Sequence, residues 1–435
     1  MKHPKIDTAI VPGKVWTAPQ AFFAILLLWS FLGNVAYPED RVPYRWSDSL
    51  LNPAPVVFGG FGTAIAATPK RILVGAPHAS KSGEEKGEVY LYESRSRKVL
   101  QTYSSPHSVG DDLFGLSVGF FEGQIMVGAP RGLDLQESRT GAVYLFDGQT
   151  GSLLRTLRNP MPMTGVFGQA LASHGSLILV GDPLASSPKT FHTGAAFLFD
   201  GKTGDLLRTF FPPDPKSGEA DRFGHRVAFV DSDVLISAPL GGIESVDSGI
   251  AYLFDGRTGK LIRSFRSPKP HPHEYFGWSF AVQGESILIG SVGYGKENPE
   301  EGVAYLFDAT TGRLVLTIRH PEPVKGDHFG EAVAMFDDLL VIGAPGNDVG
   351  GIDAGAVYLM EATTGGLQQT VVNPMPETGA ADLFGLTIVG VGTKLLVGAP
   401  YGGTETEPDS GVVHQFVPGK GFVSEAAKFE LLPNK

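Results

Sequence analysis

The sequence predicts an all-β fold, a seven-bladed β-propeller built of four-stranded antiparallel blades. A Phe-Gly pair recurs at intervals of 53 to 56 residues, and a motif related to Gly-Ala-Pro begins fourteen residues after the Phe in every copy. Such repeats indicate units that each cover the apolar faces of their neighbours. The seven Phe residues are Phe61, Phe114, Phe167, Phe223, Phe276, Phe329 and Phe384.

Each repeat contains four segments that read as strands, because they are short, rich in β-branched and aromatic residues, and separated by Gly and Pro. The second segment, as in LLVIGAP at 339–345, is a continuous apolar run, which is typical of a strand buried on both faces. The third resembles GAVYLFD at 141–147, and the fourth, such as GSLLRTLRNP at 151–160, places Arg and Thr among leucines. A sheet that becomes more polar outward is typical of a propeller blade.

The two motifs are interpreted as packing motifs. Phe is large enough to wedge between adjacent sheets, and the Gly beside it leaves room where the blades converge. In the second motif Gly-Ala keeps the strand thin, and Pro ends its hydrogen bonding. Both therefore predict architecture and not activity.

The turn between the third and fourth segments repeats as Asp-x-x-Thr-Gly. The Asp can accept hydrogen bonds from the turn's own amides and the Thr hydroxyl, while Gly takes the φ > 0 position. We interpret it as a self-capped hairpin. The four Asp residues are Asp147, Asp200, Asp255 and Asp308.

The chain is divided into three parts. Residues 1–36 are predicted to be a signal peptide, because three lysines precede an apolar run at 21–32; an uncleaved N-terminal anchor is the alternative. Residues 37–54 form an N-terminal extension, and residues 55–435 form the propeller. For the outer strand of the last blade, SLLNPAP at 49–55 competes with KFELLP at 428–433, and the sequence does not decide between them.

The composition limits the kinds of partner and the cellular location that we expect for the protein. The chain has a net charge of −11 and no Cys, so it lacks disulfides and thiolate metal sites. An acidic surface argues against nucleic acid as a partner. We expect an exported protein that is secreted, periplasmic or on the cell surface. Its oligomeric state is left open.

The two motifs resemble the FG-GAP repeat family, known from integrin alpha-chain propellers and many exported bacterial proteins. The resemblance covers about residues 55–435, although GDP at 181, SAP at 237 and GSV at 290 depart from Gly-Ala-Pro. Many members carry a calcium loop between the two motifs. Here the constant fourteen-residue interval leaves no room for such a loop. We therefore expect no cofactor and no calcium loop of the family's type, and calcium binding elsewhere in the chain is left open.

A quinone cofactor is also not expected. Quinoprotein propellers repeat an Asp-x-x-Thr-Gly turn, but they dock blades with a Trp four residues after the Gly. This chain has other residues at that place, namely Arg155, Arg208, Arg263 and Leu316.

Recognition is expected on the face that carries the connections between second and third strands, because these vary in length and composition. In integrin-like propellers this face meets ligands. The candidate binding residues are Arg131, Tyr294, Asp348 and Tyr401.

The resulting hypothesis is an exported, non-enzymatic scaffold for binding or adhesion to a protein or polysaccharide ligand. The alternatives are a hydrolase or lyase with its site in the axial channel, and a structural assembly subunit. Just after Phe-Gly on the inner strands only His225, Arg226 and Glu331 are ionisable, so the channel looks poor in catalytic groups. Acids that recur just before Phe-Gly are interpreted as blade connectors, namely Asp112, Asp221, Glu274, Asp327 and Asp382.

Overall fold

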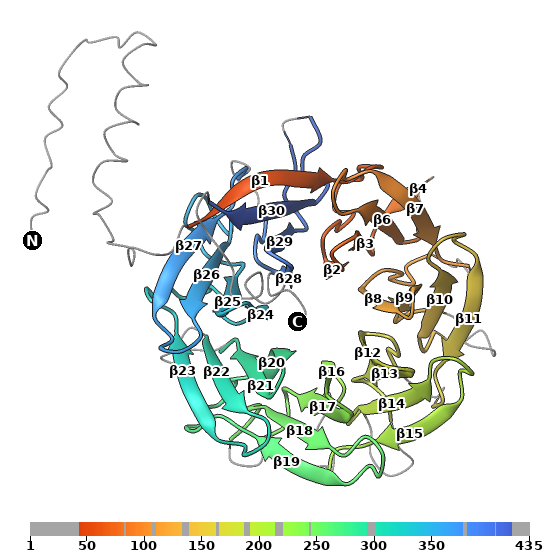
Figure 1. The fold of residues 1–435 in the computed structure, drawn as a ribbon, viewed down its shortest axis with the longest axis vertical. Coiled ribbons are helices and arrows are strands. Elements are labelled where there is room, and N and C mark those ends of the chain that lie inside the picture. The colour runs from red at the N-terminus through yellow and green to blue at the C-terminus, as the bar shows by residue number, and fades with distance from the viewer. Residues whose placement is uncertain are drawn as a thin grey trace, which may run out of the picture. The chain divides into compact units, whose positions relative to one another are not determined.

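The fold consists of seven four-stranded sheets arranged around an axis (Figure 1). The structure is a computed structural model, and the part of the chain that it describes comprises residues 43–81, 84–106, 110–132, 139–161, 165–186, 192–213, 221–242, 245–293, 302–376, 381–404 and 406–419. All of them belong to one compact unit, Val42–Lys435. The predicted signal peptide lies outside the described residues.

The sheets are numbered as blades 1 to 7 in the order of their motif Phe residues, with strands given from the axis outward. Blade 1 contains β2 (Ala64–Ala67), β3 (Arg71–Ala76), β6 (Glu88–Glu93) and β7 (Val99–Ser104). Blade 2 contains β8 (Ser117–Phe121), β9 (Gln124–Ala129), β10 (Ala142–Asp147) and β11 (Leu153–Arg158). Blade 3 contains β12 (Ala170–His174), β13 (Leu177–Asp182), β14 (Ala195–Asp200) and β15 (Leu206–Phe210).

Blade 4 contains β16 (Val227–Val230), β17 (Asp233–Ala238), β18 (Ile250–Phe254) and β19 (Leu261–Phe265). Blade 5 contains β20 (Phe276–Gln283), β21 (Ser286–Ser291), β22 (Val303–Asp308) and β23 (Leu314–Arg319). Blade 6 contains β24 (Val333–Phe336), β25 (Leu339–Ala344), β26 (Ala356–Glu361) and β27 (Leu367–Val372). Blade 7 contains β28 (Thr387–Val391), β29 (Lys394–Ala399), β30 (Val412–Pro418) and β1 (Tyr44–Leu51). A two-stranded hairpin, β4 (Ser80–Lys81) and β5 (Glu84–Glu85), extends from blade 1.

The predicted fold class is confirmed, since every blade is antiparallel and has four strands. The ring is closed by β1, which pairs with β30 from Tyr44↔Pro418 to Leu51↔Val412. A bulge between Trp46 and Asp48 matches the bulge in the other outer strands, so β1 takes the place of a fourth strand in full. The competing segment at 428–433 lies outside the described residues.

The motif Phe residues are all fully buried between neighbouring blades. Phe114, for example, packs on Tyr144 of its own blade with ring centroids 5.8 Å apart, and belongs to one core cluster with Leu73 and Val89 of blade 1. Burial of an aromatic side chain of this size contributes about 2–3 kcal/mol each. The Phe therefore holds two adjacent sheets together.

The Gly residues of the two motifs meet where blades converge. A Cβ added to Gly128 would lie 2.1 Å from the carbonyl oxygen of Gly168 in the next blade. The same contact closes the ring, where a Cβ on Gly398 would lie 2.4 Å from the carbonyl oxygen of Gly62. Contacts between the backbones of neighbouring blades thus set the spacing of the blades near the axis.

The Asp-x-x-Thr-Gly turns cap themselves. Asp147 accepts hydrogen bonds from the amides of Gln149 at 2.8 Å and Thr150 at 2.7 Å, and Gly151 has φ +75°. These hydrogen bonds lower the pKa of the Asp147 carboxyl. Corresponding amide bonds of 2.5–2.9 Å reach Asp200, Asp255 and Asp308.

The residue four places after the turn Gly docks onto the turn of the following blade. The guanidinium of Arg155 donates to the carbonyl of Gly201 at 2.8 Å, and Arg208 donates to the carbonyl of Arg257 at 2.5 Å. Arg263 donates to the carbonyl of Thr311 at 2.7 Å. These arginines therefore bridge blades at the position where quinoprotein propellers use Trp.

The acid before Phe-Gly connects the end of one blade to the start of the next. Asp112 accepts a hydrogen bond from the Phe114 amide at 3.0 Å, and Asp382 accepts one from the Asn373 side chain at 2.6 Å.

Blade 3 has Gly165 at this place, and the missing carboxylate comes from Asp182 of its GDP motif. Asp182 accepts from Asn159 Nδ2 and from the Val166 amide, both at 2.8 Å. A Cβ added to Gly165 would lie 2.4 Å from Asp182 Oδ2. The Asp182 carboxylate therefore occupies the space that a side chain at position 165 would fill.

Candidate binding site at the mouth of the axial channel

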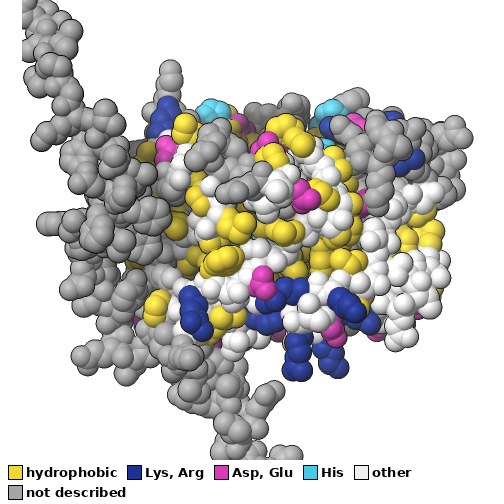
Figure 2. Space-filling model, turned by 90° about the horizontal axis from the view of Figure 1, so that it is seen from above, with side chains coloured by type: hydrophobic (Ala, Val, Ile, Leu, Met, Phe, Trp, Pro, Cys, Tyr) yellow, Lys and Arg dark blue, Asp and Glu magenta, His cyan; other side chains and the backbone are white. Residues whose placement is uncertain are grey.

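The connections on one face of the ring are alike from blade to blade, whereas those on the other face vary. One face, here called the hairpin face, carries the tight hairpins that join first to second and third to fourth strands. The opposite face, here called the loop face, carries the connections between second and third strands and those between blades. Figure 2 views the ring edge-on and shows apolar side chains across the rim, with Lys and Arg side chains gathered toward one face.

The predicted binding residues on the loop face are spread over several blades. Arg131 follows β9 and forms an ion pair of 2.7 Å with Asp111. Asp348 follows β25 and accepts a hydrogen bond from the amide of Asp353 at 2.9 Å. Each of these residues thus contacts a neighbouring loop residue.

Tyr401 follows β29, and its ring packs edge-on against Phe58 with centroids 6.3 Å apart. Tyr294 lies outside the described residues. The described candidates Arg131, Asp348 and Tyr401 belong to blades 2, 6 and 7, and each contacts a different residue, namely Asp111, Asp353 and Phe58.

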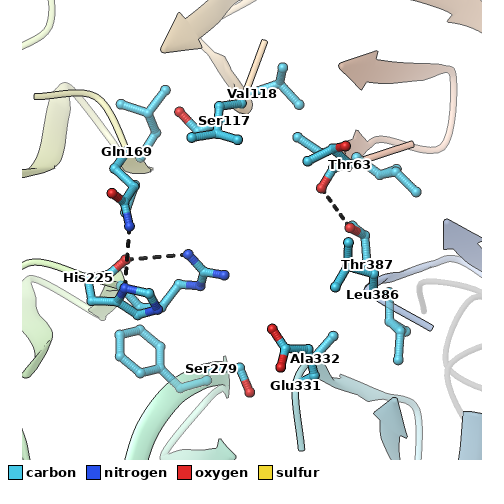
Figure 3. A pocket seen from close by; sticks show the side chains of 18 of the residues that line it. Thr63, Ser117, Val118, Gln169, His225, Ser279, Glu331, Ala332, Leu386 and Thr387 are labelled. Atoms are coloured by element: carbon cyan, nitrogen blue, oxygen red, sulfur yellow. Dashed lines mark hydrogen bonds between the residues drawn. The ribbon is translucent and has the colours of Figure 1, made fainter. Parts of the chain in front are cut away.

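A cavity of about 430 Å³ lies on the axis, lined by the residues that follow Phe-Gly in all seven blades (Figure 3). The lining starts one residue after Phe-Gly in each blade except blade 5, where it starts one residue later. The cavity therefore occupies the end of the channel that adjoins the loop face. Of its lining residues, only His225, Arg226 and Glu331 are ionisable.

The residue directly after Phe-Gly varies around the ring, and at four successive blades it forms a chain of contacts. Gln169 Nε2 lies 3.3 Å from His225 Nδ1, and the His225 ring packs on Trp278 with centroids 4.8 Å apart. The indole of Trp278 donates to Glu331 Oε1 at 2.7 Å. This Gln-His-Trp-Glu arc joins blades 3, 4, 5 and 6. The corresponding residues of blades 7, 1 and 2 are Leu386, Thr63 and Leu116.

His225 is neutral in this arc. Burial lowers its pKa well below the usual value, and the nearby guanidinium groups of Arg226 and Arg222 lower it further. It is buried with an exposed fraction of 5%. The imidazole therefore acts as a packing and hydrogen-bonding group between Gln169 and Trp278.

The next position along the inner strands is small in every blade but one. Its hydroxyl groups bind the carbonyl oxygens of adjacent blades, with Ser117 Oγ donating to Gly168 O at 2.6 Å and Thr387 Oγ1 to Thr63 O at 2.7 Å. In blade 4 this position is Arg226, which lines the cavity. Burial lowers the pKa of its guanidinium, and the carboxylate of Glu331 opposes that shift.

The cavity wall thus combines one cation with one anion, an amide and an imidazole, and the Trp278 indole contacts His225 and Glu331 of this wall. Sequence reasoning singled out His225, Arg226 and Glu331 but missed their connection through Trp278 and Gln169. The available signal was that one aligned repeat position carries Gln, His, Trp and Glu in succession.

The described residues contain neither a metal-binding cluster nor a membrane-spanning helix. Within the described ranges no group of three or more His, Asp or Glu side chains could hold a metal ion. The same part of the chain contains no helix long and apolar enough to cross a membrane.

Part of the chain is similar in sequence to a known repeat family and to known proteins. The sequence model of the FG-GAP repeat matches residues 320–360, which comprise the connection that follows blade 5 and most of blade 6. Human integrin alpha-11 is 32% identical over 126 residues, which are 26% of this chain and 10% of the integrin. Mouse integrin alpha-11 is 30% identical over 128 residues, again 26% of this chain and 10% of the relative. The match therefore spans about a tenth of these relatives.

The seven Phe-Gly repeats, the seven four-stranded blades, the match to the FG-GAP repeat and the similarity to integrin alpha-11 together support an integrin alpha-like FG-GAP propeller.

Proposed function

We propose that this propeller is an exported, non-enzymatic scaffold that binds a protein or polysaccharide ligand through its loop face, in the cell envelope or outside the cell. The observation that carries the proposal is the contrast between the two faces. The hairpin face repeats one turn and one kind of Arg contact from blade to blade. The loop face carries connections that differ in length and sequence, which is how recognition is usually built on a rigid scaffold.

The composition of the channel favours binding over catalysis. Hydrolysis of a glycosidic bond ordinarily needs two carboxyl groups, whereas Glu331 is the one acidic residue among those that line the cavity. The hydroxyl groups of Ser117 and Thr387 are already bonded to backbone carbonyls of adjacent blades. The ring of His225 contacts Gln169 and Trp278 and not these hydroxyl groups.

The proposal is tested by immobilising the full-length chain and screening it against a panel of extracellular proteins and an array of polysaccharides. Arg131→Ala, Asp348→Ala and Tyr401→Ala remove side chains from the loop face, and each is expected to weaken a true ligand's binding several-fold. Lys260→Ala is the matched control, because Lys260 is exposed in a turn of the hairpin face.

The opposite pattern, in which Lys260→Ala abolishes binding and the three loop variants bind normally, would refute the proposed face. Release of new products from a bound polysaccharide would refute the non-enzymatic assignment and favour the axial-channel enzyme. A structural assembly subunit predicts instead a stable complex that survives all three loop substitutions.

A further inference from the structure

We propose that the mouth of the axial channel is a pocket for one unit of an acidic saccharide, a sugar ring that carries a carboxylate, with Arg226 holding the carboxylate. The inference goes beyond the proposed function, since it concerns a small ligand on the axis and not a macromolecule on the loops.

The cavity has the size of a small-ligand site. Its volume of about 430 Å³ lies within the range of about 300–1,000 Å³ found for ligand pockets. All seven inner strands contribute to its wall, so the pocket is preformed by the rigid ring. Binding there needs little ordering of the protein, which favours affinity for a small molecule.

Arg226 is the group that selects for an acid. A guanidinium presents five N–H donors in a planar fork that matches a carboxylate. The hydrogen bond seen for the Arg226 side chain is a long one, from Nη1 to the His225 carbonyl at 3.4 Å. The residue is half-buried and is flanked on the axis by small side chains such as Ala170 and Ser279. A carboxylate can therefore approach the guanidinium in a partly desolvated site, where charge-assisted hydrogen bonds are strongest.

The arc beside Arg226 offers acceptors and donors for hydroxyl groups. Figure 3 shows Gln169, His225 and Glu331 at the edge of the opening, on three different blades. Gln169 supplies an amide, and Glu331 supplies a carboxylate that the Trp278 indole holds in place. Sugar hydroxyls both donate and accept, so they fit a wall on which the two kinds of group alternate.

Aromatic rings extend this polar wall toward the loop face. Trp278 packs against Tyr275 with centroids 6.0 Å apart, and Tyr275 packs against His273 at 6.0 Å. Such rings supply apolar area together with a polar tip. Across the channel Leu116 and Leu386 line the cavity. A saccharide ring, which has apolar C–H faces and a polar edge, matches this division better than a simple organic acid does.

The test uses D-glucuronate as the probe and measures its binding to the full-length chain by isothermal titration calorimetry. D-glucose has the ring without the carboxylate, acetate has the carboxylate without the ring, and L-alanine is a small zwitterion. We expect D-glucuronate to bind at least about tenfold more tightly than each of the other three, in line with the loss of one charge-assisted contact or of the ring contacts.

Two variants assign the site. Arg226→Gln is expected to reduce D-glucuronate affinity about tenfold or more and to remove the preference over D-glucose. Gln169→Leu places in blade 3 the residue that blades 2 and 7 have at this position, and it is expected to weaken binding less. Arg313→Gln, in an exposed hairpin-face turn, is the control and should bind as the wild type does.

Equal binding of D-glucuronate and D-glucose by the wild type, no D-glucuronate binding at all, or unchanged D-glucuronate binding by Arg226→Gln would each overturn the proposal. Tighter binding of L-alanine than of D-glucuronate would replace the saccharide with a zwitterionic ligand. These outcomes leave the loop-face function standing, because that function is read from Arg131, Asp348 and Tyr401 with a macromolecular ligand.

Discussion

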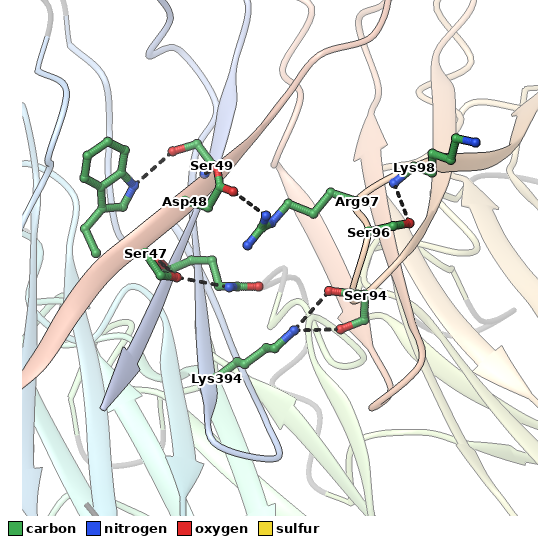
Figure 4. Close-up of polar contacts among 10 residues, drawn as sticks. Ser47, Asp48, Ser49, Ser94, Ser96, Arg97, Lys98 and Lys394 are labelled. Carbon is green, nitrogen blue, oxygen red and sulfur yellow. Dashed lines mark hydrogen bonds and ion pairs between the residues drawn. The ribbon is translucent and has the colours of Figure 1, made fainter. Parts of the chain in front are cut away.

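Arg97, in the hairpin of blade 1, forms an ion pair with Asp48 of β1 (Figure 4). Asp48 pairs with Gln415 in the same register in which Arg155 pairs with Leu145 of blade 2. At the seam between the two ends of the ring, the outer strand therefore supplies the anion and the turn supplies the cation.

A second contact at this seam follows the ordinary pattern. Lys394 of β29 donates to the carbonyl of Ser94 at 3.0 Å (Figure 4). Arg71 of β3 likewise donates to the carbonyl of Gly148 at 2.9 Å between blades 1 and 2. The contact between blades 7 and 1 thus resembles the contacts between the other neighbouring blades. It differs at one position, where the charged group on the outer strand is an anion and not a cation.

Arg97→Gly is expected to be at least as stable as the wild type. Arg97 has φ +58° at the turn position where Gly151 has φ +75°, and a left-handed conformation costs a non-Gly residue about 1–2 kcal/mol. The ion pair is partly exposed, with 31% and 44% of its side chains accessible, and such pairs contribute about 0.2–1 kcal/mol. Urea unfolding of the full chain measures the difference.

Arg97→Ala is the matched control, because it loses the same ion pair and keeps the unfavourable φ. It should be about 1 kcal/mol less stable than Arg97→Gly. Equal stability of the two variants would show that the turn relaxes and that no strain is stored at this position.

Asp182→Ala and Gly165→Asp are each expected to destabilise the protein, and the double variant is expected to recover most of the loss. The first leaves the Asn159 and Val166 donors without their buried acceptor, which costs about 1–3 kcal/mol. The second forces a second carboxylate into the same space. Together they give blade 3 the Ala and Asp found in blade 2.

Chemical denaturation of the four proteins gives the coupling free energy. If the double variant is as unstable as the sum of the single variants, the two positions do not share a carboxylate site. Burial raises the pKa of Asp182 to about 7, so the measurement belongs at one fixed pH.

His414→Phe is expected to make the protein less sensitive to acid. His414 is buried at the position that Phe197 occupies in blade 3, and burial lowers its pKa to about 3. The unfolded chain therefore binds the proton first as the pH falls below about 6.5. Stability from this group is complete above that value and is lost as the pH falls toward 3.

The substitution removes the binding of at most one proton on unfolding. The free energy of unfolding of the variant should therefore depend on pH less steeply, by at most about 1.4 kcal/mol per pH unit. Denaturant unfolding of wild type and variant between pH 7 and pH 5 measures it. The variant also removes the hydrogen bond between His414 Nδ1 and Ser49 Oγ, at 2.9 Å, so its absolute stability will differ. An identical slope for both proteins would contradict a neutral buried His414.

Calcium is expected to leave the thermal midpoint of the full chain unchanged. The first two strands of blade 4 are joined by only two residues, and Asp231 there has φ +51° as part of a tight turn. A calcium site needs about six to eight oxygen ligands. Scanning calorimetry in EGTA and in millimolar calcium tests this, and a rise of several degrees, equivalent to about 1 kcal/mol or more, would show that a loop binds the ion.

The fold was predictable because the spacing of Phe-Gly and Gly-Ala-Pro reports packing that every blade repeats. Contacts that break the repeat were not predictable in this way. The pairing of Asp182 with Asn159 looked like a mere departure from Gly-Ala-Pro, and the contact of Trp278 with Glu331 joins residues 53 positions apart. The N-terminal strand was one of two candidates for the last blade, since short apolar segments at both ends fit the same edge.

The pairing of β1 with β30 also orders the events of biosynthesis. The ribosome makes β1 before any other strand of the ring, yet its partner, Val412–Pro418, is made after all the other described strands. Pairs so distant in sequence form slowly, because a long loop must close before any contact is gained. β1 therefore has no partner strand while the strands of six blades are synthesised, and the circle can close only after β30 has been made.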